Sequence, residues 1–478
     1  MPFYPPSSPT TSFQASLAPF LTHDGLPFAD VLTAQDVQNA CADEGLSCQG
    51  DAHSIFNPAL VLWAWLSQVL GNDKSCRAAV MRIIVLLVAL ERGPCSTDTA
   101  AYCRARAKMP AAVLRRLTLQ IGRQLEDAVP KRWLWHGQHV FLVDGATVTL
   151  PDTEDNQQAY PQPPSQKPGL GFPIIRMVML LSLATAALQG LAFGPYEGKE
   201  TGEPALLRNL LEQIAKGSII LADRYYCSYF MIALLQEHGV DVVMRLHQRR
   251  QVDFRRGRRL GPDDHLVAWH KPERPDWMGQ ETYDRMPARL VVREVRTQVR
   301  RPGYRVHELV VVTTLCDAAR YSPEDLTDLY HERWHVELDI RSIKTALGME
   351  QLRCLSRHMV RKEMWVFWLA YNLVRKVSAQ AALERGLHPR QISFTATKQA
   401  VLAGWSAMTQ ESPNKRLALG RALLAALGKE EVGNRPGRCE PRAVKRRRKP
   451  HRLLMKPRTE ARAEMLRGWA EASQAQGQ

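Results

Sequence analysis

Apolar and polar residues follow two different periods along this chain, and the change between the periods predicts its organisation. From about residue 32 to residue 125 apolar positions recur at helical spacing, and the stretches 59–70 and 79–90 are apolar enough to form buried helix faces. At His139 the pattern changes to short strand-like runs, VFLVD and ATVTLP, and Asp144 ends the first of them. A loop rich in Pro and Gly, QQAYPQPPSQKPGLGFP, follows.

The next segment predicts strands that alternate with helices. Residues 177–196 carry no charge and fit two consecutive buried strands, and a polar helix begins near Gly202. A second apolar run, SIILAD, ends at Asp223, and a helix over 225–237 and the strand VDVVMRLH follow it. This alternation predicts an α/β fold in which helices cover the faces of a mixed sheet.

A segment over 248–320 interrupts the alternation, with basic turns in RRQVDFRRGRRLG and strand-like runs in ARLVVREVRTQV and HELVVVTTL. We therefore expect a β-rich insertion there, and helices resume at Pro323 and continue over 361–384. The predicted division is a loose arm, a helical region, a core in two parts around the insertion, and a helical region with a basic tail. The arm covers 1–30 and the helical region 31–132. The core covers 133–247 and 321–385, and the helical region with the basic tail covers 386–478.

Charge is distributed unevenly over the 478 residues, whose formal net charge is +16. No Lys or Arg precedes Lys74, so the excess of positive charge lies after residue 73. The densest part is 435–467, with the run Lys445, Arg446, Arg447, Arg448 and Lys449 at its centre. Such a cluster favours salt-dependent contact with a phosphate backbone, and the alternative is a solubilising tail.

Cysteine usage and the amino-terminal segment favour the cytoplasm. The nine cysteines form no CxxC pair or regular framework, which fits a reducing compartment. The segment MPFYPPSSPTTSF lacks the basic region that begins a secretory signal. Residues 177–196 are long enough to span a membrane, but polar residues and Pro195 dilute them, so we expect strands and no membrane partner.

The most informative motif lies in YHERWHVELDIRSIKTALGM. At about 100° per residue, four of its side chains fall on one narrow face of a helix, whereas Glu332 and Asp339 point the other way. The four are Tyr330, Arg333, Glu337 and Lys344. A single carboxylate between two cations and a phenol is an arrangement that can hold a metal ion and a phosphate together.

The same helix contains HExxH, formed by His331, Glu332 and His335, which in zinc proteases supplies two ligands and a general base. Such a site needs a third ligand on a following element, and the nearest acids, Glu350 and Glu363, are poorly placed for it. We therefore reject the zinc interpretation.

Two aspartates at strand ends give Glu337 possible partners. Asp144 and Asp223 each close a short buried strand, and ligands of open α/β sheets bind at the carboxyl ends of strands. Each alone is more often a turn former or cap. Together with Glu337 they could hold two Mg²⁺ or Mn²⁺ ions about 3.5 to 4 Å apart, as in phosphodiester cleavage. Arg333 and Lys344 would grip phosphates.

The spacing Y-x2-R-x3-E-x6-K resembles the DDE transposases of bacterial insertion sequences, in the branch that this motif marks. The blocks VDGATVTLPDT and LADRYYCSYF, around Asp144 and Asp223, are also similar to those of the family, so the resemblance covers about 139–363. It implies an RNase H-like catalytic core, interrupted by the β-rich insertion, with Asp144, Asp223 and Glu337 as the metal-binding triad. Tyr330, Arg333 and Lys344 would contact DNA phosphates.

The resemblance also implies an activity and partners. Family members nick the ends of the element and join the freed 3′-hydroxyl to target DNA, acting as homodimers in a synaptic complex with double-stranded DNA. The expected location is the bacterial cytoplasm, at the nucleoid. In related elements a flipped base stacks on an aromatic side chain, for which Trp269 and Trp277 are candidates, and the alternative for either is packing in the core. Helices over 392–427 would suit the dimer interface.

The region that reads the element ends departs from the family pattern. Relatives often use an amino-terminal domain, but the first 73 residues here are acidic, so we shift the expected DNA-binding region to about 76–132. Five basic residues there could form a helix-turn-helix-like surface: Arg104, Arg106, Lys108, Arg115 and Arg116. The alternative is a helical cap on the core, and the acidic segment could cover a basic surface or contact a second protomer.

Two other functions remain open from the sequence. One is an RNase H-like, metal-dependent nuclease that cuts DNA without strand transfer. The other is a DNA-binding derivative without catalysis, against which the acids at all three positions weigh.

Overall fold

The computed structural model of the chain describes residues 34–45, 55–56, 58–89, 93–298, 308–409, 413–432 and 454–475. The loose arm expected over 1–30 and the basic run from Lys445 to Lys449 lie outside the described residues.

The described strands form a nine-stranded sheet in the order β3-β2-β1-β4-β5-β9-β8-β7-β6. The neighbours β1–β4 and β4–β5 are parallel, and the other pairs are antiparallel. Their bounds are β1 Val140–Thr149, β2 Ile174–Ser182, β3 Leu188–Pro195, β4 Ile219–Ala222, β5 Asp241–Arg245, β6 Arg258–Gly261, β7 Asp264–His270, β8 Arg289–Gln298 and β9 Glu308–Thr313. The mixed α/β architecture predicted from the sequence is confirmed.

The apolar stretch 177–196 forms the antiparallel pair β2 and β3, as expected. Strands β6 to β9 follow in the segment expected to be a β-rich insertion, and β9 pairs with β5. The insertion is therefore not a separate sheet but an extension of the core sheet. No helix among the residues described here is long and apolar enough to cross a membrane.

Helices cover both faces of the sheet because alternate residues of a strand point to opposite sides. Val140 and Leu142 join an apolar core with residues of α3, α6 and α13, whereas Phe141 and Val143 join a second core with α8 and α9. The helices of the amino-terminal half are α2 Ala34–Asp43, α3 Pro58–Leu70, α4 Cys76–Ala89, α5 Ala100–Lys108, α6 Ala111–Asp127, α7 Glu154–Ala159, α8 Glu203–Arg208 and α9 Tyr229–Glu237. Those that follow are α10 Gln280–Arg285, α11 Pro323–Glu332, α12 Trp334–Arg341, α13 Arg357–Arg385, α14 Phe394–Thr409, α15 Pro413–Leu427 and α16 Arg458–Ala475.

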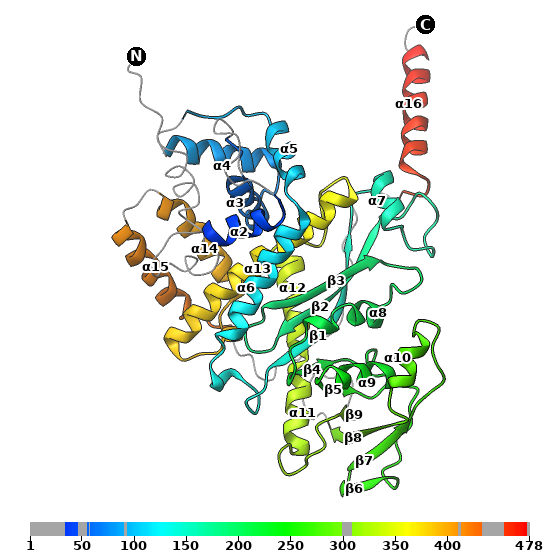
Figure 1. Cartoon of the computed structure of the whole chain (residues 1–478). Coiled ribbons are helices and arrows are strands. Elements are labelled where there is room, and N and C mark those ends of the chain that lie inside the picture. The colour runs from blue at the N-terminus through cyan, green and yellow to red at the C-terminus, as the bar shows by residue number, and fades with distance from the viewer. Residues whose placement is uncertain are drawn as a thin grey trace.

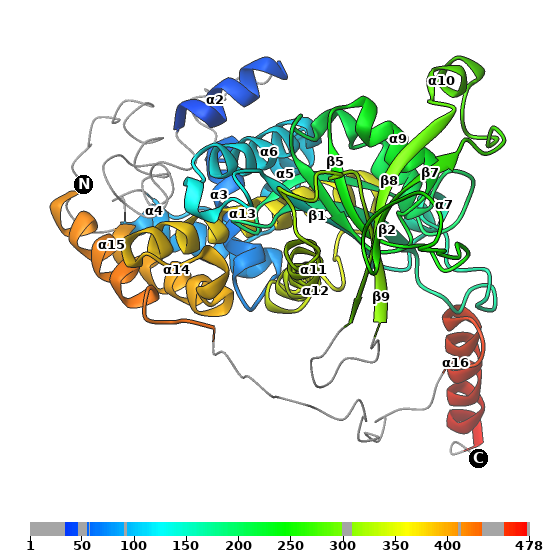
Figure 2. The same cartoon turned by 90° about the horizontal axis from the view of Figure 1, so that it is seen from below.

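Helix α13 joins the two ends of the described chain. It packs against α3 and α6 from the amino-terminal half and against α14 and α15 from the carboxy-terminal half. Figures 1 and 2 show these helices together on one side of the molecule and the sheet on the other. Asn372 of α13 donates to the carbonyl oxygens of Thr118 and Leu188, at 3.0 and 3.1 Å, and accepts from the Leu188 N–H at 2.8 Å.

The contact between α6 and β3 depends on a glycine. A methyl group at Gly122 would lie 2.1 Å from the Leu188 carbonyl oxygen, so only glycine lets the helix approach the strand this closely. The three elements α6, β3 and α13 are thus fixed to one another by backbone contact and by one buried amide.

Helix α11 begins at Pro323, as the sequence predicts, and Ser322 caps it. The Ser322 hydroxyl accepts from the Asp325 N–H at 3.0 Å, and the Asp325 carboxylate accepts from the Ser322 N–H at 3.0 Å, which forms a capping box. Leu326, Leu329 and the Val336 side chain of α12 are buried in the first core. This packing lays α11 and α12 across β5 and β1.

Candidate active site

The two predicted aspartates lie side by side along parallel strands. Leu142 of β1 pairs with Leu221 of β4, so Asp144 and Asp223 each stand two residues beyond this pair. Asp223 directly follows β4, as expected, but β1 continues to Thr149, so the expectation that Asp144 ends its strand is wrong. Its antiparallel partner β2 supports β1 past this point, where Asp144 pairs with Met179.

The third predicted acid, Glu337, and Asp144 both contact the side chain of Arg333. The Nη2 atom of Arg333 lies 3.1 Å from Oε1 of Glu337, and its Nη1 atom lies 3.9 Å from Oδ2 of Asp144. One guanidinium therefore stands between carboxylates from β1 and α12. Arg333 is itself the junction between α11 and α12 and keeps helical dihedral angles, φ −51° and ψ −31°.

Burial and nearby charges perturb the Asp144 carboxyl. Burial raises its pKa from an ordinary 3.8 to about 6, and the negative charges of Asp223 and Glu203 act in the same direction. The Gly145 N–H, which donates to Asp144 Oδ1 at 2.8 Å, and the Arg333 charge lower the pKa and offset part of this effect. The site therefore concentrates negative charge that a cation would neutralise.

Tyr330 and Lys344 have different surroundings. The Tyr330 side chain is buried, which raises its pKa to about 12, and the charges of Arg333, Arg245 and Asp223 act on its hydroxyl. It is thus a neutral phenol beside the site. Lys344 is half-buried and lies in a π-helical turn, Ser342–Ala346, so the uniform 100° rotation assumed from the sequence does not extend to it.

The described residues include no group of three His, Cys, Asp or Glu side chains placed to hold one metal ion. In this arrangement the Arg333 guanidinium takes the position between Asp144 and Glu337. The donors that face it are carboxylate oxygens, which are the ligands of Mg²⁺ and Mn²⁺. Asp144 and Glu337 therefore offer the type of ligand that a hard divalent cation takes.

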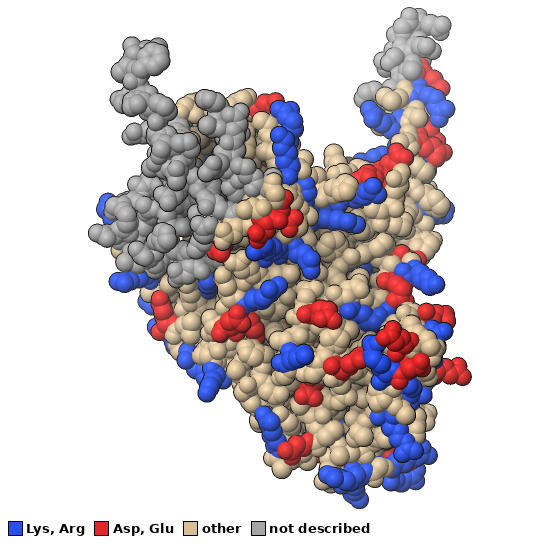
Figure 3. Space-filling model, in the orientation of Figure 1, with Lys and Arg blue, Asp and Glu red and all other residues tan. Residues whose placement is uncertain are grey.

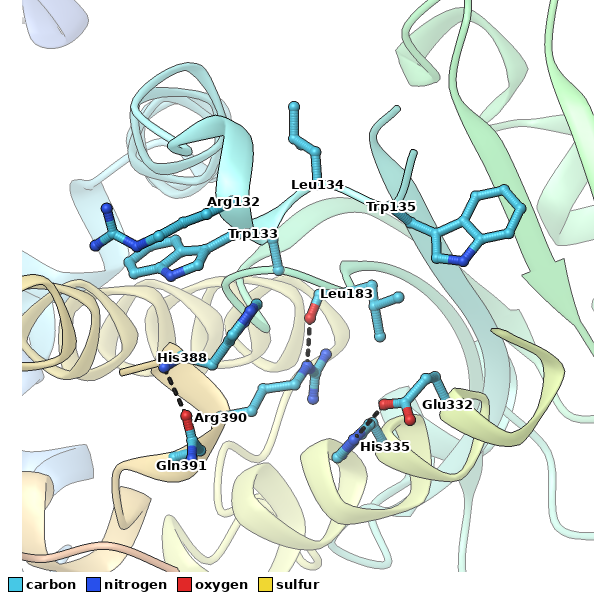
Figure 4. A pocket seen from close by; sticks show the side chains of 11 residues that line it. Arg132, Trp133, Leu134, Trp135, Leu183, Glu332, His335, His388, Arg390 and Gln391 are labelled. Atoms are coloured by element: carbon cyan, nitrogen blue, oxygen red, sulfur yellow. Dashed lines mark hydrogen bonds and ion pairs between the residues drawn. The ribbon is translucent and has the colours of Figure 1, made fainter. Parts of the chain in front are cut away.

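The HExxH residues lie on another side of the helix. The Nε2 atom of His335 lies 2.8 Å from Oε2 of Glu332, so the acid that would serve as general base in a zinc protease contacts a histidine of the same motif. Both side chains line a pocket of about 450 Å³, together with Trp133, His388 and Arg390. Figure 4 shows this pocket between α11–α12 and the turns around Trp133 and His388.

The two tryptophans proposed to stack on a flipped base lie in the second core. Trp269 is 5% exposed, its indole N–H donates to Glu294 at 3.0 Å, and the Arg250 guanidinium covers its ring at 3.7 Å. This burial contradicts the prediction for Trp269. Trp277 is only partly buried and lies 3.7 Å from the Arg208 guanidinium, so it stays a candidate.

The basic helices before the core behave mainly as a cap. Arg106 is 5% exposed and lies over the Trp65 ring at 4.1 Å, so its predicted contact with DNA is wrong. Arg104, Lys108 and Arg115 are exposed, and Arg116 forms an ion pair with Asp43. Helix α6 uses its apolar face against α13 and β3, which is the helical-cap alternative.

Helix α2, a described part of the acidic segment, contacts one residue of this basic surface, Arg116. Besides the ion pair of Asp43 with Arg116, Asp36 of α2 accepts from Gln120 of α6 at 2.7 Å. The role of the acidic segment, covering a basic surface or contacting a second protomer, stays a prediction.

A second basic surface was missed from the sequence as a site. The turn between β5 and β6 and the start of β6 carry five exposed arginines: Arg249, Arg255, Arg256, Arg258 and Arg259. Figure 3 shows Lys and Arg side chains gathered at this end of the molecule, over β6 and β7. The sequence shows that this turn is basic, but it does not show that the five side chains are exposed together at the end of the sheet. We call these five residues the hairpin arginines.

A fourth carboxylate at the site, Glu203, was also missed. It is the first residue of α8, and its Oε2 atom accepts from the Tyr226 hydroxyl at 3.2 Å. In the sequence it sits in a polar stretch, YEGKETGEP, with two other glutamates, and no spacing marks it.

The chain is similar to several known proteins. A family model described as the transposase DDE domain matches residues 135–373. The transposase InsG for insertion sequence element IS4 of Escherichia coli K12 is 27% identical over 394 residues, which cover 81% of this chain and 85% of that protein. The putative transposase InsZ of the same strain is 29% identical over 143 residues, or 29% and 46% of the two chains.

A solved structure is also similar. It is the piggyBac transposase synaptic complex with hairpin DNA, with a TM-score of 0.41 and 12% identity, and the similarity covers 89% of this chain and 87% of that chain.

Proposed function

This chain belongs to the transposase DDE domain family, and from that membership we propose how its described residues cut and join DNA. Its activity is that of an insertion-sequence transposase, which cleaves DNA and transfers the cleaved strand. We assign catalysis to Asp144, Asp223 and Glu337. The observation that carries the assignment is the Arg333 guanidinium, which lies between Asp144 and Glu337 and so brings two of the three predicted acids to one place.

The core is proposed to be RNase H-like. Its support is the order β3-β2-β1-β4-β5, with β1–β4 and β4–β5 parallel and β2 and β3 antiparallel. This order sets Asp144 on the central strand and Asp223 at the carboxyl end of its neighbour, the edge at which open α/β sheets bind ligands.

Two Mg²⁺ or Mn²⁺ ions are the proposed cofactors, and Asp144, Asp223 and Glu337 would hold them. When bound, such ions activate the attacking oxygen and stabilise the leaving oxygen of a phosphodiester. The three carboxylates must be ionised to bind them, and because burial raises the pKa of Asp144, a bound cation would favour the ionised form of this group.

Arg333 then has a second role. Once Glu337 turns toward the cations, its partner guanidinium is free to bind a DNA phosphate, with the bidentate geometry that Arg offers. Tyr330 stays neutral beside it and donates a hydrogen bond, and Lys344 contacts the phosphate backbone further along the helix.

Double-stranded DNA is the proposed partner, and the hairpin arginines are proposed to bind its backbone together with the exposed Arg104, Lys108 and Arg115. A homodimer in a synaptic complex, with α14 and α15 at its interface, remains part of the proposal. Trp277 is the remaining candidate for stacking on a flipped base.

The test replaces Glu337 with Gln and follows cleavage of DNA that carries the terminal repeats of the element. We expect end cleavage to fall below detection, because an amide cannot replace a carboxylate ligand, while binding of the repeats stays unchanged. The matched control is Glu332→Gln on the same helical segment, whose side chain pairs with His335 and faces the pocket, and it should cut at the normal rate. Normal cleavage by Glu337→Gln would overturn the assignment.

Pre-cut ends with a free 3′-hydroxyl separate a transposase from a nuclease. The wild-type protein should join them to target DNA, and Glu337→Gln should not.

A further inference from the structure

We propose that Glu203 is a fourth carboxylate of the catalytic site and binds one divalent cation together with Asp144. This inference rests on the proposed function, because it assumes that Asp144 is a metal ligand. It assigns a role to a residue outside the three sequence blocks that define the site.

The chain holds Glu203 on a rigid frame. It opens α8, which packs against β2 and β3, and the buried side chains of Leu206 and Leu207 anchor that helix in the second core. The turn before the helix is tied to the sheet, because Arg176 of β2 donates to the Thr201 carbonyl oxygen at 3.1 Å. The carboxylate therefore occupies a fixed position rather than a mobile surface one.

That position adjoins the first aspartate. A methyl group placed on Gly145, the residue after Asp144, would lie 2.2 Å from both Cδ and Oε1 of Glu203. The carboxylate thus lies against the backbone of β1 at Gly145, where a larger residue would have to displace it. Gly145 and Asp144 point to opposite faces of β1, but β4 ends beside them, so the Glu203 charge acts on Asp144 around the open edge of β1.

The same carboxylate also touches the second aspartate block. Its Oε2 atom accepts from the hydroxyl of Tyr226, three residues after Asp223, at 3.2 Å. Oε2 is therefore oriented by a buried phenol, whereas Oε1 is directed at the β1 backbone beside Asp144. A ligand whose one oxygen is fixed by a hydrogen bond while the other reaches the metal is a common arrangement in metal sites.

Charge balance distinguishes this role from a purely structural one. Asp144, Asp223 and Glu203 come from β1, the end of β4 and α8, and the basic groups that act on them are Arg333 from α11–α12 and Arg176 from β2. With Glu337, which also faces Arg333, four acids and two bases leave two negative charges, which one divalent cation would neutralise. If Glu203 only held Tyr226 and Arg176 in place, its charge would matter for folding and not for metal binding.

The experiment measures binding of Mn²⁺ to the full-length protein by calorimetry, for the wild type and for Glu203→Gln. The amide oxygen of Gln can still accept from Tyr226, so the fold should be kept while the charge is lost. We expect Mn²⁺ binding to weaken by about 10- to 100-fold, the range seen when groups around a metal are removed. The matched control is Glu212→Gln, because Glu212 is exposed and pairs with His238 at 3.2 Å, and it should bind Mn²⁺ as the wild type does.

Two further variants make each outcome decisive. Tyr226→Phe removes the hydrogen bond to Glu203 and should weaken Mn²⁺ binding less than Glu203→Gln does; an equal loss in both, with an equal loss of thermal stability, would overturn the metal-binding role. If Glu203→Gln does not fold, Glu203→Asp decides, because the shorter acid keeps the charge but not the reach. Unchanged affinity in that variant would also overturn the proposal.

Asp144→Asn separates this inference from the proposed function. If Asp144→Asn loses Mn²⁺ binding and Glu203→Gln does not, only the role of Glu203 fails. If Asp144→Asn binds Mn²⁺ normally, or if the wild type binds none, the proposed function fails as well.

Discussion

At Asp144, burial and neighbouring acids oppose ionisation more strongly than Arg333 and the Gly145 N–H favour it, which brings the pKa of this carboxyl to about 6. Between pH 4 and 6 the folded state therefore binds more protons at this residue than the unfolded state does. Stability from this group is present below the ordinary pKa of 3.8 and is lost as the pH rises through 6.

Asp144→Asn should accordingly stabilise the metal-free protein at neutral pH. An amide carries no charge to bury, so the free energy of unfolding at pH 7 should rise by on the order of 2 kcal/mol, and the gain should vanish near pH 4. Urea denaturation of both proteins in chelator, at several pH values, measures this. A gain that is independent of pH would contradict the explanation.

Single residues were predicted where local spacing decides their neighbours. The i,i+4 pair of Arg333 and Glu337 follows from helix geometry alone, and the structure confirms it at 3.1 Å. Arg106 and Trp269 were mispredicted because their exposure depends on distant elements: the Trp65 ring of α3 covers one, and Arg250 and Glu294 enclose the other. Glu203 could not be found for the same reason, since its neighbour Gly145 is far away in sequence.

At the scale of elements, the helix that carries Glu337 is held in place by a buried cluster on its opposite side. Asp339 of α12 is fully buried and accepts from Arg375 of α13 and from Arg390, both at 2.8 Å. Arg390 also donates to the Ser182 carbonyl oxygen at 2.8 Å, at the end of β2. One carboxylate thus ties α12 to α13 and to the sheet.

Asp339→Asn should destabilise the protein by about 3–5 kcal/mol, because it leaves two buried guanidinium groups without their counter-charge. Denaturant unfolding followed by circular dichroism measures the loss. Asp328→Asn is the control on the adjoining helix, since the Asp328 side chain is 79% exposed and the change should stay within about 0.5 kcal/mol. Equal small effects in both variants would show that the cluster contributes little.

The sequence predicted elements well where the hydrophobic period was clear, as for β2, β3, β5 and the start of α11 at Pro323. It failed at element ends. Strand β1 runs past Asp144 because β2 continues to pair with it, and the helix after Pro323 loses its regular pattern at Arg333 and widens at Ser342. Contacts between elements that are distant in sequence set where these strands and helices end, and the local hydrophobic period does not indicate these ends.

At the scale of the whole molecule, the catalytic edge and the hairpin arginines belong to one continuous sheet. Strand β9 pairs with β5 and so connects the strands β6, β7 and β8 to the core. Strand pairing therefore fixes the basic end of the sheet relative to Asp223. A surface fixed in this way can guide DNA toward the carboxylates.

Reversing the charge of Arg258 and Arg259 together should weaken DNA binding equally for all sequences. Because each lost phosphate contact releases fewer counterions, the slope of log affinity against log salt should fall by about 1 per residue. Fluorescence anisotropy over a range of salt concentrations measures it. Lys216→Glu is the control, since Lys216 is exposed just before β4, at the end of that strand away from Asp223; an equal loss in that variant would point to net charge alone.

The position of α13 has a consequence for synthesis of the chain on the ribosome. The apolar faces of α3 and α6 are covered by a helix that ends at Arg385, far later in the sequence. At about 5–20 residues per second, these faces stay uncovered for on the order of tens of seconds after they emerge. A product that stops before α13 would keep them uncovered permanently, so truncated copies of this gene should yield aggregates or chaperone clients rather than a folded amino-terminal fragment.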